Sequence, residues 1–185
     1  MSSNKNYIAK DIFVKYLGNK YFMELAGELK HYNAYRITEE EETLWRNDLI
    51  NQLFFQLSNS ISNYEYIMIH SDLSQLVTKL NNPQIENHFL EETIKKIKSV
   101  DAYTKLRLII NVIDNVIHHN ILNQKSLSPL EQRTINLMKL ELKNMLESSI
   151  SVDDSYKDKI DADLLTGIFI KEYAKNKLDL LNILE

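Results

Sequence analysis

The sequence predicts an all-α protein, and two observations carry this prediction. The 185 residues include only 3 Gly and 2 Pro, which leaves few residues for the positive-φ turns that β-hairpins need. Apolar residues also recur at spacings of three and four along most of the chain, which is the period of a helix with one buried side. We therefore expect residues 1–185 to form a single-domain bundle of about seven or eight helices.

The most apolar stretch of helical length runs from Asp101 to Asn123 and is called the spine below. Its apolar residues form a continuous arc that covers roughly half of the helix circumference. They are Leu106, Ile109, Ile110, Val112, Ile113, Val116, Ile117 and Ile121. A face this wide predicts contact with several helices at once. We expect the spine to be the buried helix at the centre of the bundle.

Two helices are predicted at the N-terminal end, over residues 4–17 and 21–35. Gly18 and Asn19 are suited to end the first, because glycine and asparagine tolerate the left-handed conformation that often closes a helix. Gly27 lies inside the second. A glycine in a helix interior costs about 1 kcal/mol relative to alanine, so Gly27 marks either a close helix contact or a break.

Three further helices are predicted before the spine, over residues 39–58, 64–80 and 83–98. Thr38 and Glu41 have the spacing of a capping box, in which each side chain accepts from the other residue's backbone N–H. Asn82 and Pro83 combine a capping residue with a proline at the first helical position. We expect the apolar face of the first of these helices, which contains Trp45, to pack against the spine.

After the spine, the start of the next helix has the strongest local signal in the chain. Ser128, Pro129 and Glu131 supply both a capping box and a proline at the first helical position, which predicts a helix over 129–148. The polar segment 148–159 is predicted to be a mobile loop. Apolar spacing then predicts a last helix from Asp161 or Ala162 to about Leu184.

Composition and charge narrow the classes of function. With 22 Lys and Arg against 26 Asp and Glu, the net charge of −4 gives no overall attraction to nucleic acid or to anionic membranes. No apolar run is long enough to span a membrane, and the N-terminal residues lack the pattern of a signal peptide. The absence of cysteine excludes disulfides, cysteine-ligated zinc and thiol catalysis, and fits a cytoplasmic protein.

One group of polar residues is a candidate site. The polar side of the spine, called the polar stripe below, consists of Arg107, Asn111, Asp114, Asn115 and His118. These side chains have the chemistry to line a pocket, with Asp114 and His118 one helical turn apart as an acid–base pair. The ordinary interpretation, which we expect, is that the stripe faces solvent.

Metal and cofactor sites have weaker signals. Asp153, Asp154 and Asp158 resemble carboxylate ligands for a divalent cation, but they lack the glycine and terminal glutamate of an EF-hand loop. Glu28 and His31 form a single copy of a pattern that di-iron bundles use twice. A solvated surface is the simpler explanation of both groups, so we expect no metal ion and no cofactor.

These observations favour a non-enzymatic function, with no catalytic residue identified. We expect a cytoplasmic interaction or regulatory protein that presents a helical surface to another protein, with self-association left open. One alternative is a sensor or carrier that encloses a small apolar ligand or haem, for which His70, His88 and His118 are the available ligands. Another is a metal-dependent hydrolase or nuclease that uses the polar stripe or the acidic segment.

Overall fold

The computed structural model describes residues 2–80, 82–123 and 126–183. Within these ranges all regular structure is helical, with no β-strand. The all-α prediction is confirmed. The chain separates into two compact units, Met1–Ser58 and Asn59–Glu185, which we call the N-terminal unit and the C-terminal unit. That the two units together form one domain stays a prediction.

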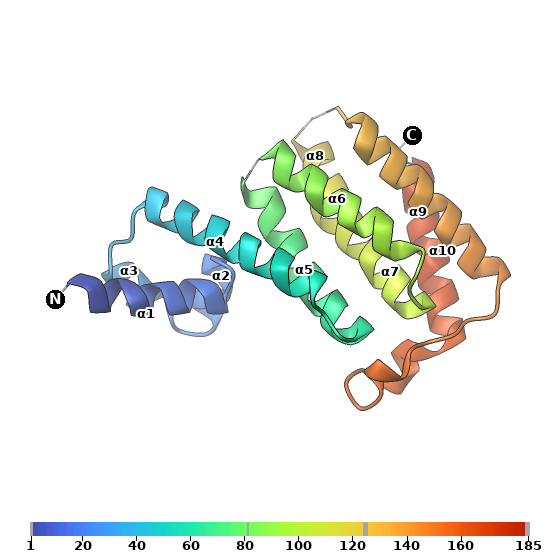
Figure 1. Cartoon of the computed structure of the whole chain (residues 1–185), viewed down its shortest axis with the longest axis horizontal. Helices are drawn as coiled ribbons and strands as arrows, with labels where there is room; N and C mark the ends of the chain where they lie inside the picture. The colour runs from blue at the N-terminus through green and yellow to red at the C-terminus, as the bar shows by residue number, and fades with distance from the viewer. Residues whose placement is uncertain (1, 81, 124–125, 184–185) are drawn as a thin grey trace. The chain divides into compact units, whose positions relative to one another are not determined.

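The N-terminal unit consists of four helices around a small aromatic core (Figure 1). They are α1 (Ser2–Lys15), α2 (Lys20–Leu25), α3 (Leu29–Ala34) and α4 (Glu39–Ser58). Phe13 and Trp45 meet edge to face in this core, with ring centroids 5.7 Å apart. Ala9, Ile12, Met23 and Tyr32 complete it. Trp45 therefore packs within the N-terminal unit, whereas packing of the apolar face of α4 against the spine, which belongs to the other unit, stays a prediction.

The helix predicted over residues 21–35 is two short helices. Gly27 lies between α2 and α3 with φ at +74°, a conformation that is not helical and that glycine adopts without steric cost. Asn19 caps α2, because its side-chain oxygen accepts from the backbone N–H of Tyr21 at 3.1 Å. Gly27 therefore marks a break between two helices and not a close contact inside one helix.

The C-terminal unit contains the remaining elements. These are α5 (Asn63–Leu80), α6 (Pro83–Ile97), α7 (Ala102–Asn111), a π-helix η1 (Val112–Ile117), α8 (His118–Leu122), α9 (Pro129–Glu147), two 3₁₀ turns η2 (Asp154–Tyr156) and η3 (Ala162–Leu165), and α10 (Gly167–Ile183). The spine is the continuous run of α7, η1 and α8. Its first part, α7, contacts α5, α6, α9 and α10 (Figure 1), so it lies at the centre of this unit as predicted.

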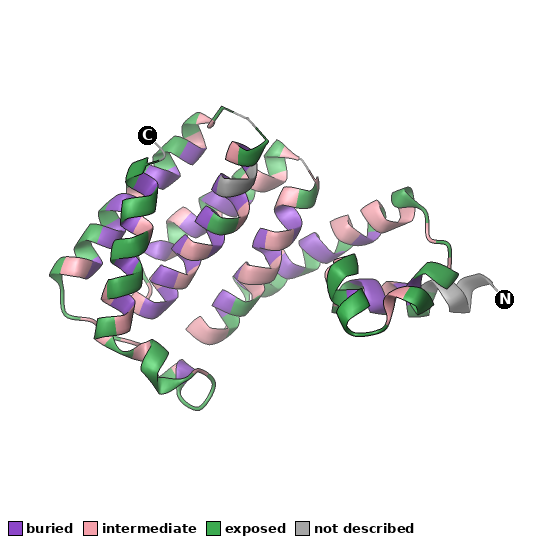
Figure 2. Cartoon of the chain, turned by 180° about the vertical axis from the view of Figure 1, so that it is seen from behind, coloured by how far each residue is buried: buried purple, intermediate pink, exposed green. Residues whose placement is uncertain are grey.

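The apolar face of the spine is buried. Six of its predicted core residues have at most 1% of their surface exposed: Leu106, Ile109, Val112, Ile113, Val116 and Ile117. Figure 2 shows buried residues concentrated along the helices of this unit. Ile110 and Ile121 are half-buried, because they lie at the edges of the apolar arc. The prediction of a buried central helix is confirmed.

Two capping boxes form as predicted and fix where helices begin. Thr38 donates its backbone N–H to Glu41 at 2.9 Å, and the N–H of Glu41 donates to the threonine hydroxyl at 3.2 Å. Ser128 and Glu131 make the equivalent pair at 2.8 and 3.2 Å. Both helices begin at the residue that follows the cap, because these bonds satisfy backbone N–H groups that have no partner inside the helix.

Replacing Ser128 with alanine is expected to lower the free energy of unfolding by about 1 kcal/mol, because the N–H of Glu131 loses its acceptor at the start of α9. Urea titration followed by circular dichroism measures this change. Ser126→Ala is the matched control, since Ser126 is exposed and lies before the cap. Equal losses for the two variants would show that the cap does not stabilise α9.

The polar segment 148–159, which the sequence predicted to be a mobile loop, is joined to the core by two contacts, and its mobility stays a prediction. Tyr156 is fully buried, and its hydroxyl hydrogen-bonds to the hydroxyl of Thr104 at the start of the spine. Ser151 accepts from the backbone N–H of Ala102 at 3.1 Å. One buried aromatic ring therefore joins an otherwise polar connection to the core.

Candidate functional site

The polar stripe of the spine is divided between neighbouring helices. Asn111 is 4% exposed and donates its amide to Nδ1 of His70 on α5 at 3.1 Å. Asn115, one turn later, donates to the hydroxyl of Ser74 on the same helix at 2.9 Å. Asp114 points elsewhere and forms an ion pair with Lys177 on α10 at 2.7 Å. The expectation that the whole stripe faces solvent is therefore wrong.

His70 has hydrogen bonds at both ring nitrogens. The Thr93 hydroxyl donates to the carbonyl of Phe89 at 2.9 Å, so it accepts from Nε2–H of His70 at 2.8 Å. Nδ1 must then be the acceptor for Asn111, which fixes the neutral tautomer with its proton on Nε2. Burial lowers the pKa of His70 to about 3, since the charged form is poorly solvated there. Neither ring nitrogen is left to ligate a haem iron.

The remaining residues of the polar stripe do not complete a catalytic group. Arg107 is half-buried near Tyr103, where burial raises the pKa of the tyrosine and the positive charge of Arg107 opposes this rise. The side chain of His118 lies outside the described residues, so the predicted pair with Asp114 is untested. Within the described residues, Asn111 and Asn115 are the two residues of the polar stripe that hydrogen-bond to the same neighbouring helix, α5.

Other polar residues of the spine also contact neighbouring helices. Lys105 pairs with Glu141 on α9 at 2.6 Å, and both side chains are largely buried. Asn120 donates to Glu86 on α6 at 2.8 Å and to Glu131 on α9 at 2.7 Å. These carboxylates lie near the starts of their helices, where the helix dipole favours negative charge. The polar groups of the spine thus connect the helices of the C-terminal unit.

The acidic segment forms an open hollow on the surface. Asp153, Asp154 and Asp158 are exposed and line a space of about 370 Å³ together with Lys157. Asp153 accepts from the N–H of Ser155 at 2.8 Å, and hydrogen bonds from this residue lower the pKa of the carboxyl. Among the residues that the structure describes, no three His, Cys, Asp or Glu side chains are placed to hold a metal ion.

Glu28 and His31 also have partners within the N-terminal unit. Glu28 accepts from the ammonium group of Lys15 at 2.7 Å. Nε2 of His31 lies 2.6 Å from the hydroxyl of Tyr35, one turn along the chain. These contacts describe a hydrogen-bonded helix surface.

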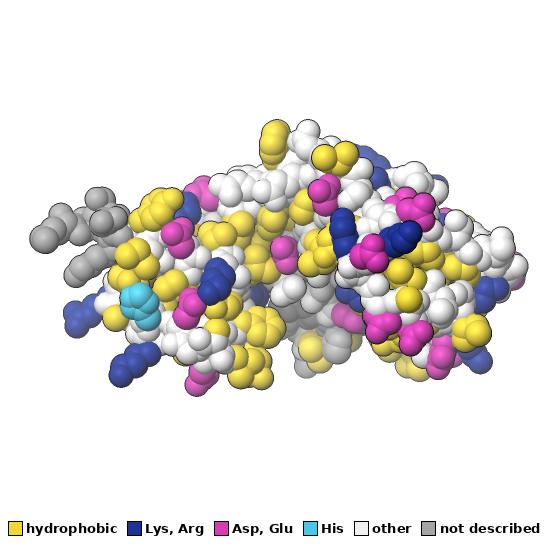
Figure 3. All heavy atoms as spheres, turned by 90° about the horizontal axis from the view of Figure 1, so that it is seen from below, with side chains coloured by type: hydrophobic (Ala, Val, Ile, Leu, Met, Phe, Trp, Pro, Cys, Tyr) yellow, Lys and Arg dark blue, Asp and Glu magenta, His cyan; other side chains and the backbone are white. Residues whose placement is uncertain are grey.

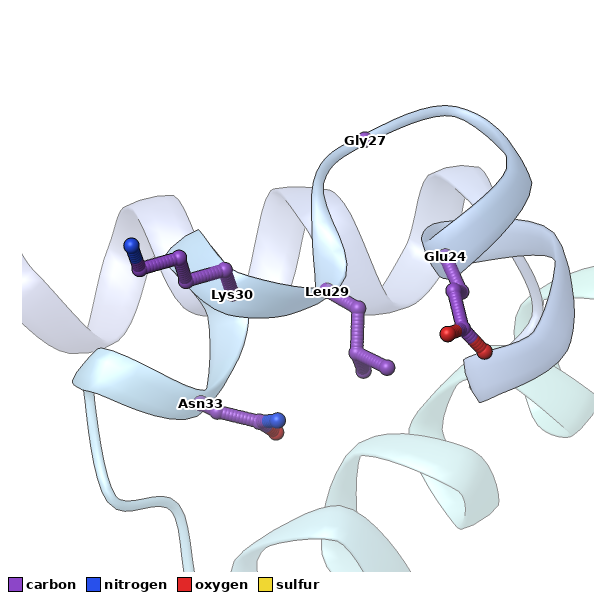
Figure 4. A pocket seen from close by; sticks show the side chains of 5 residues that line it. All are labelled: Glu24, Gly27, Leu29, Lys30 and Asn33. Carbon is purple, nitrogen blue, oxygen red and sulfur yellow. The ribbon is translucent and has the colours of Figure 1, made fainter.

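A second hollow lies between α2 and α3 in the N-terminal unit, with a volume of about 380 Å³. Its lining residues are Glu24, Gly27, Leu29, Lys30 and Asn33. Figure 4 shows Leu29 in the middle, with the carboxylate of Glu24 toward one end and Lys30 toward the other. Both surface hollows have charged residues in their lining, which differs from the apolar walls that a carrier of apolar ligands uses.

The outer face of α2 carries three exposed apolar side chains beside this hollow. Tyr21 is 63% exposed, Phe22 47% and Leu25 68%, whereas Met23 is fully buried. The rings of Tyr21 and Phe22 lie 5.7 Å apart, and Leu25 follows within one turn. The three side chains therefore form one patch, which we call the α2 patch.

The sequence analysis did not identify the α2 patch, because it assigned no exposed face to the helix predicted over residues 21–35. The signal was present in the sequence, since Tyr21, Phe22 and Met23 are consecutive and point in three directions on a helix. In the six residues of α2, the side chain of Met23 is buried, whereas those of Tyr21 and Phe22 point outward and are exposed.

None of the helices in the described ranges combines the length and the apolar character that a membrane span needs. Comparisons with protein-family models, with curated proteins and with solved structures return no match. We therefore base the functional proposal on the geometry of this chain.

Proposed function

We propose that this chain is a cytoplasmic, non-enzymatic interaction protein that binds another protein through the α2 patch. The observation that carries the proposal is the exposure of Tyr21, Phe22 and Leu25 side by side on one short helix. Aromatic and aliphatic side chains that cluster on a surface are typical of binding sites, whereas single exposed ones are common on any protein. The cysteine-free sequence supports the cytoplasmic setting.

The contacts of the spine support a non-enzymatic role. The polar groups of Asn111, Asn115 and His70 are engaged with one another or with neighbouring helices inside the C-terminal unit. Exposed apolar side chains remain on the surface, as Figure 3 shows for one face of the molecule. Binding through such side chains removes apolar area from water, which is the main favourable term in protein association.

A pulldown with the α2 patch altered tests this proposal. We expect Tyr21→Ser combined with Leu25→Ser to reduce the recovery of the bound protein from an extract of the native host by about tenfold or more, because buried anchor residues dominate binding energy. Quantitative mass spectrometry of the captured proteins measures the change.

Ile168→Ser is the control for this experiment, since Ile168 is 83% exposed but lies on α10 in the other unit. Specific partners are those lost with the α2 variant and retained with the control. Recovery that is the same for both variants would refute a role of the α2 patch in binding.

A further inference from the structure

We propose that the partner of the α2–α3 face is a second copy of this chain, bound around a two-fold axis that passes near Leu29. This inference rests on the proposed function, because it names what the surface binds. Two observations support it. Glu24 and Lys30 lie toward opposite ends of the hollow between α2 and α3, and neither has an ion-pair partner in the described part of the chain.

The hollow has a negative end, an apolar middle and a positive end. Glu24 lies toward one end, Leu29 in the middle and Lys30 toward the other end (Figure 4). The Lys30 side chain extends away from Glu24, so the two charges do not neutralise each other within one chain. This arrangement is complementary to itself when a second copy is turned by 180°.

Glu24 and Lys30 differ from three lysines of the N-terminal unit, which have carboxylate partners. Lys10, Lys15 and Lys20 each pair with a carboxylate of that unit, at distances of 3.1, 2.7 and 3.1 Å. In the described part of the chain, neither Glu24 nor Lys30 has an ion-pair partner. Both are exposed, so they are available to a partner molecule.

A two-fold interface contains each contact twice, because residue i of one copy contacts residue j of the other, and residue j of the first copy contacts residue i of the second. With the axis near Leu29, Glu24 of each copy meets Lys30 of the other, and the exposed parts of the two half-buried Leu29 side chains lie near the axis. Tyr21 lies one helical turn from Glu24, so the apolar contact continues from the hollow onto the α2 patch. Gly27 is exposed and borders open space, since an added Cβ there would meet no atom within 4 Å, so its backbone is accessible to a second copy.

Charge reversal tests this pairing on the full-length chain. Glu24→Lys and Lys30→Glu each convert both predicted ion pairs into like-charge contacts, so each variant is expected to weaken dimerisation by about tenfold or more. The double variant restores both pairs with their signs exchanged and should dimerise within about threefold of the wild type. Sedimentation equilibrium over a series of protein concentrations measures the dissociation constants.

Lys175→Glu on α10 is the control, because it makes the same change of charge at an exposed position of the other unit. Its dimerisation should match that of the wild type. Circular dichroism of all variants checks that the helices are retained, as expected for exposed positions. Dimerisation of the wild type should also weaken as salt is added, since ion pairs at a surface are screened.

The outcomes separate this inference from the proposed function. A wild-type chain that stays monomeric at every concentration overturns the second copy as partner. The proposed function still stands in that case if the α2 variant loses a captured protein that the Ile168 control retains. A dimer that is insensitive to both single reversals, or that the double variant fails to restore, overturns the pairing of Glu24 with Lys30.

Discussion

Replacing Ile113 with alanine is expected to lower the free energy of unfolding by about 2–5 kcal/mol. Ile113 has 1% of its surface exposed and lies in the π-helical turn of the spine, which packs against α5. The truncation leaves a cavity that a densely packed interior fills only in part, which adds to the lost transfer free energy. Urea titration monitored by circular dichroism measures the change.

Leu122→Ala is the control on the same continuous helix. Leu122 is 71% exposed, so its truncation should change the free energy of unfolding by no more than about 0.5 kcal/mol. A loss below about 1 kcal/mol for Ile113→Ala would contradict the position assigned to the spine.

His70 is expected to make the protein less stable in acid. The folded-state pKa of about 3 lies below the ordinary histidine value of 6.5, so the unfolded chain binds a proton in a pH range where the folded chain does not. The contribution of His70 to the free energy of unfolding is fully present above pH 6.5. It decreases by about 1.4 kcal/mol per pH unit as the pH falls toward the folded-state pKa. Urea titrations at several pH values between 6.5 and 4 measure the slope.

His70→Gln separates this effect from the titration of carboxyl groups. A glutamine offers an N–H to Thr93 and a carbonyl to Asn111, but it does not titrate. The variant should therefore lose less stability with falling pH than the wild type. Identical slopes for the two proteins would mean that His70 is protonated without penalty and is not buried as the structure describes.

Several helix boundaries could be predicted from sequence because their causes are local. Thr38 with Glu41, and Ser128 with Glu131, are three residues apart, so their hydrogen bonds follow from spacing alone. The buried face of the spine was also predictable, since helical periodicity places its isoleucines and valines on one arc.

The contacts of the polar stripe could not be predicted because they are long-range. Asn111 and His70 are separated by 41 residues, and periodicity carries no information about which helix faces which. The π-helical turn at Val112–Ile117 also has no local sequence signal that we recognised. Tyr156 lies in a polar segment, so its burial depends on the space left beside Tyr103 and Thr104.

The α2 patch was missed for a different reason. Gly27 was compatible with either a continuous or a broken helix, and the structure shows a break, with Phe22 and Leu25 exposed on the short helix before it. The candidate binding face became recognisable once the exposure of each side chain was known.

The central claim is that the spine is the buried core helix of the C-terminal unit, while the α2–α3 face of the N-terminal unit binds another molecule. Amide hydrogen exchange followed by mass spectrometry, compared between dilute and concentrated protein, tests both halves at once. We expect higher protein concentration to slow exchange in peptides from residues 20–34, and peptides from Ala102–Asn111 to exchange slowly at both concentrations. Fast exchange in the spine, or concentration-dependent protection there and not in residues 20–34, would contradict the account.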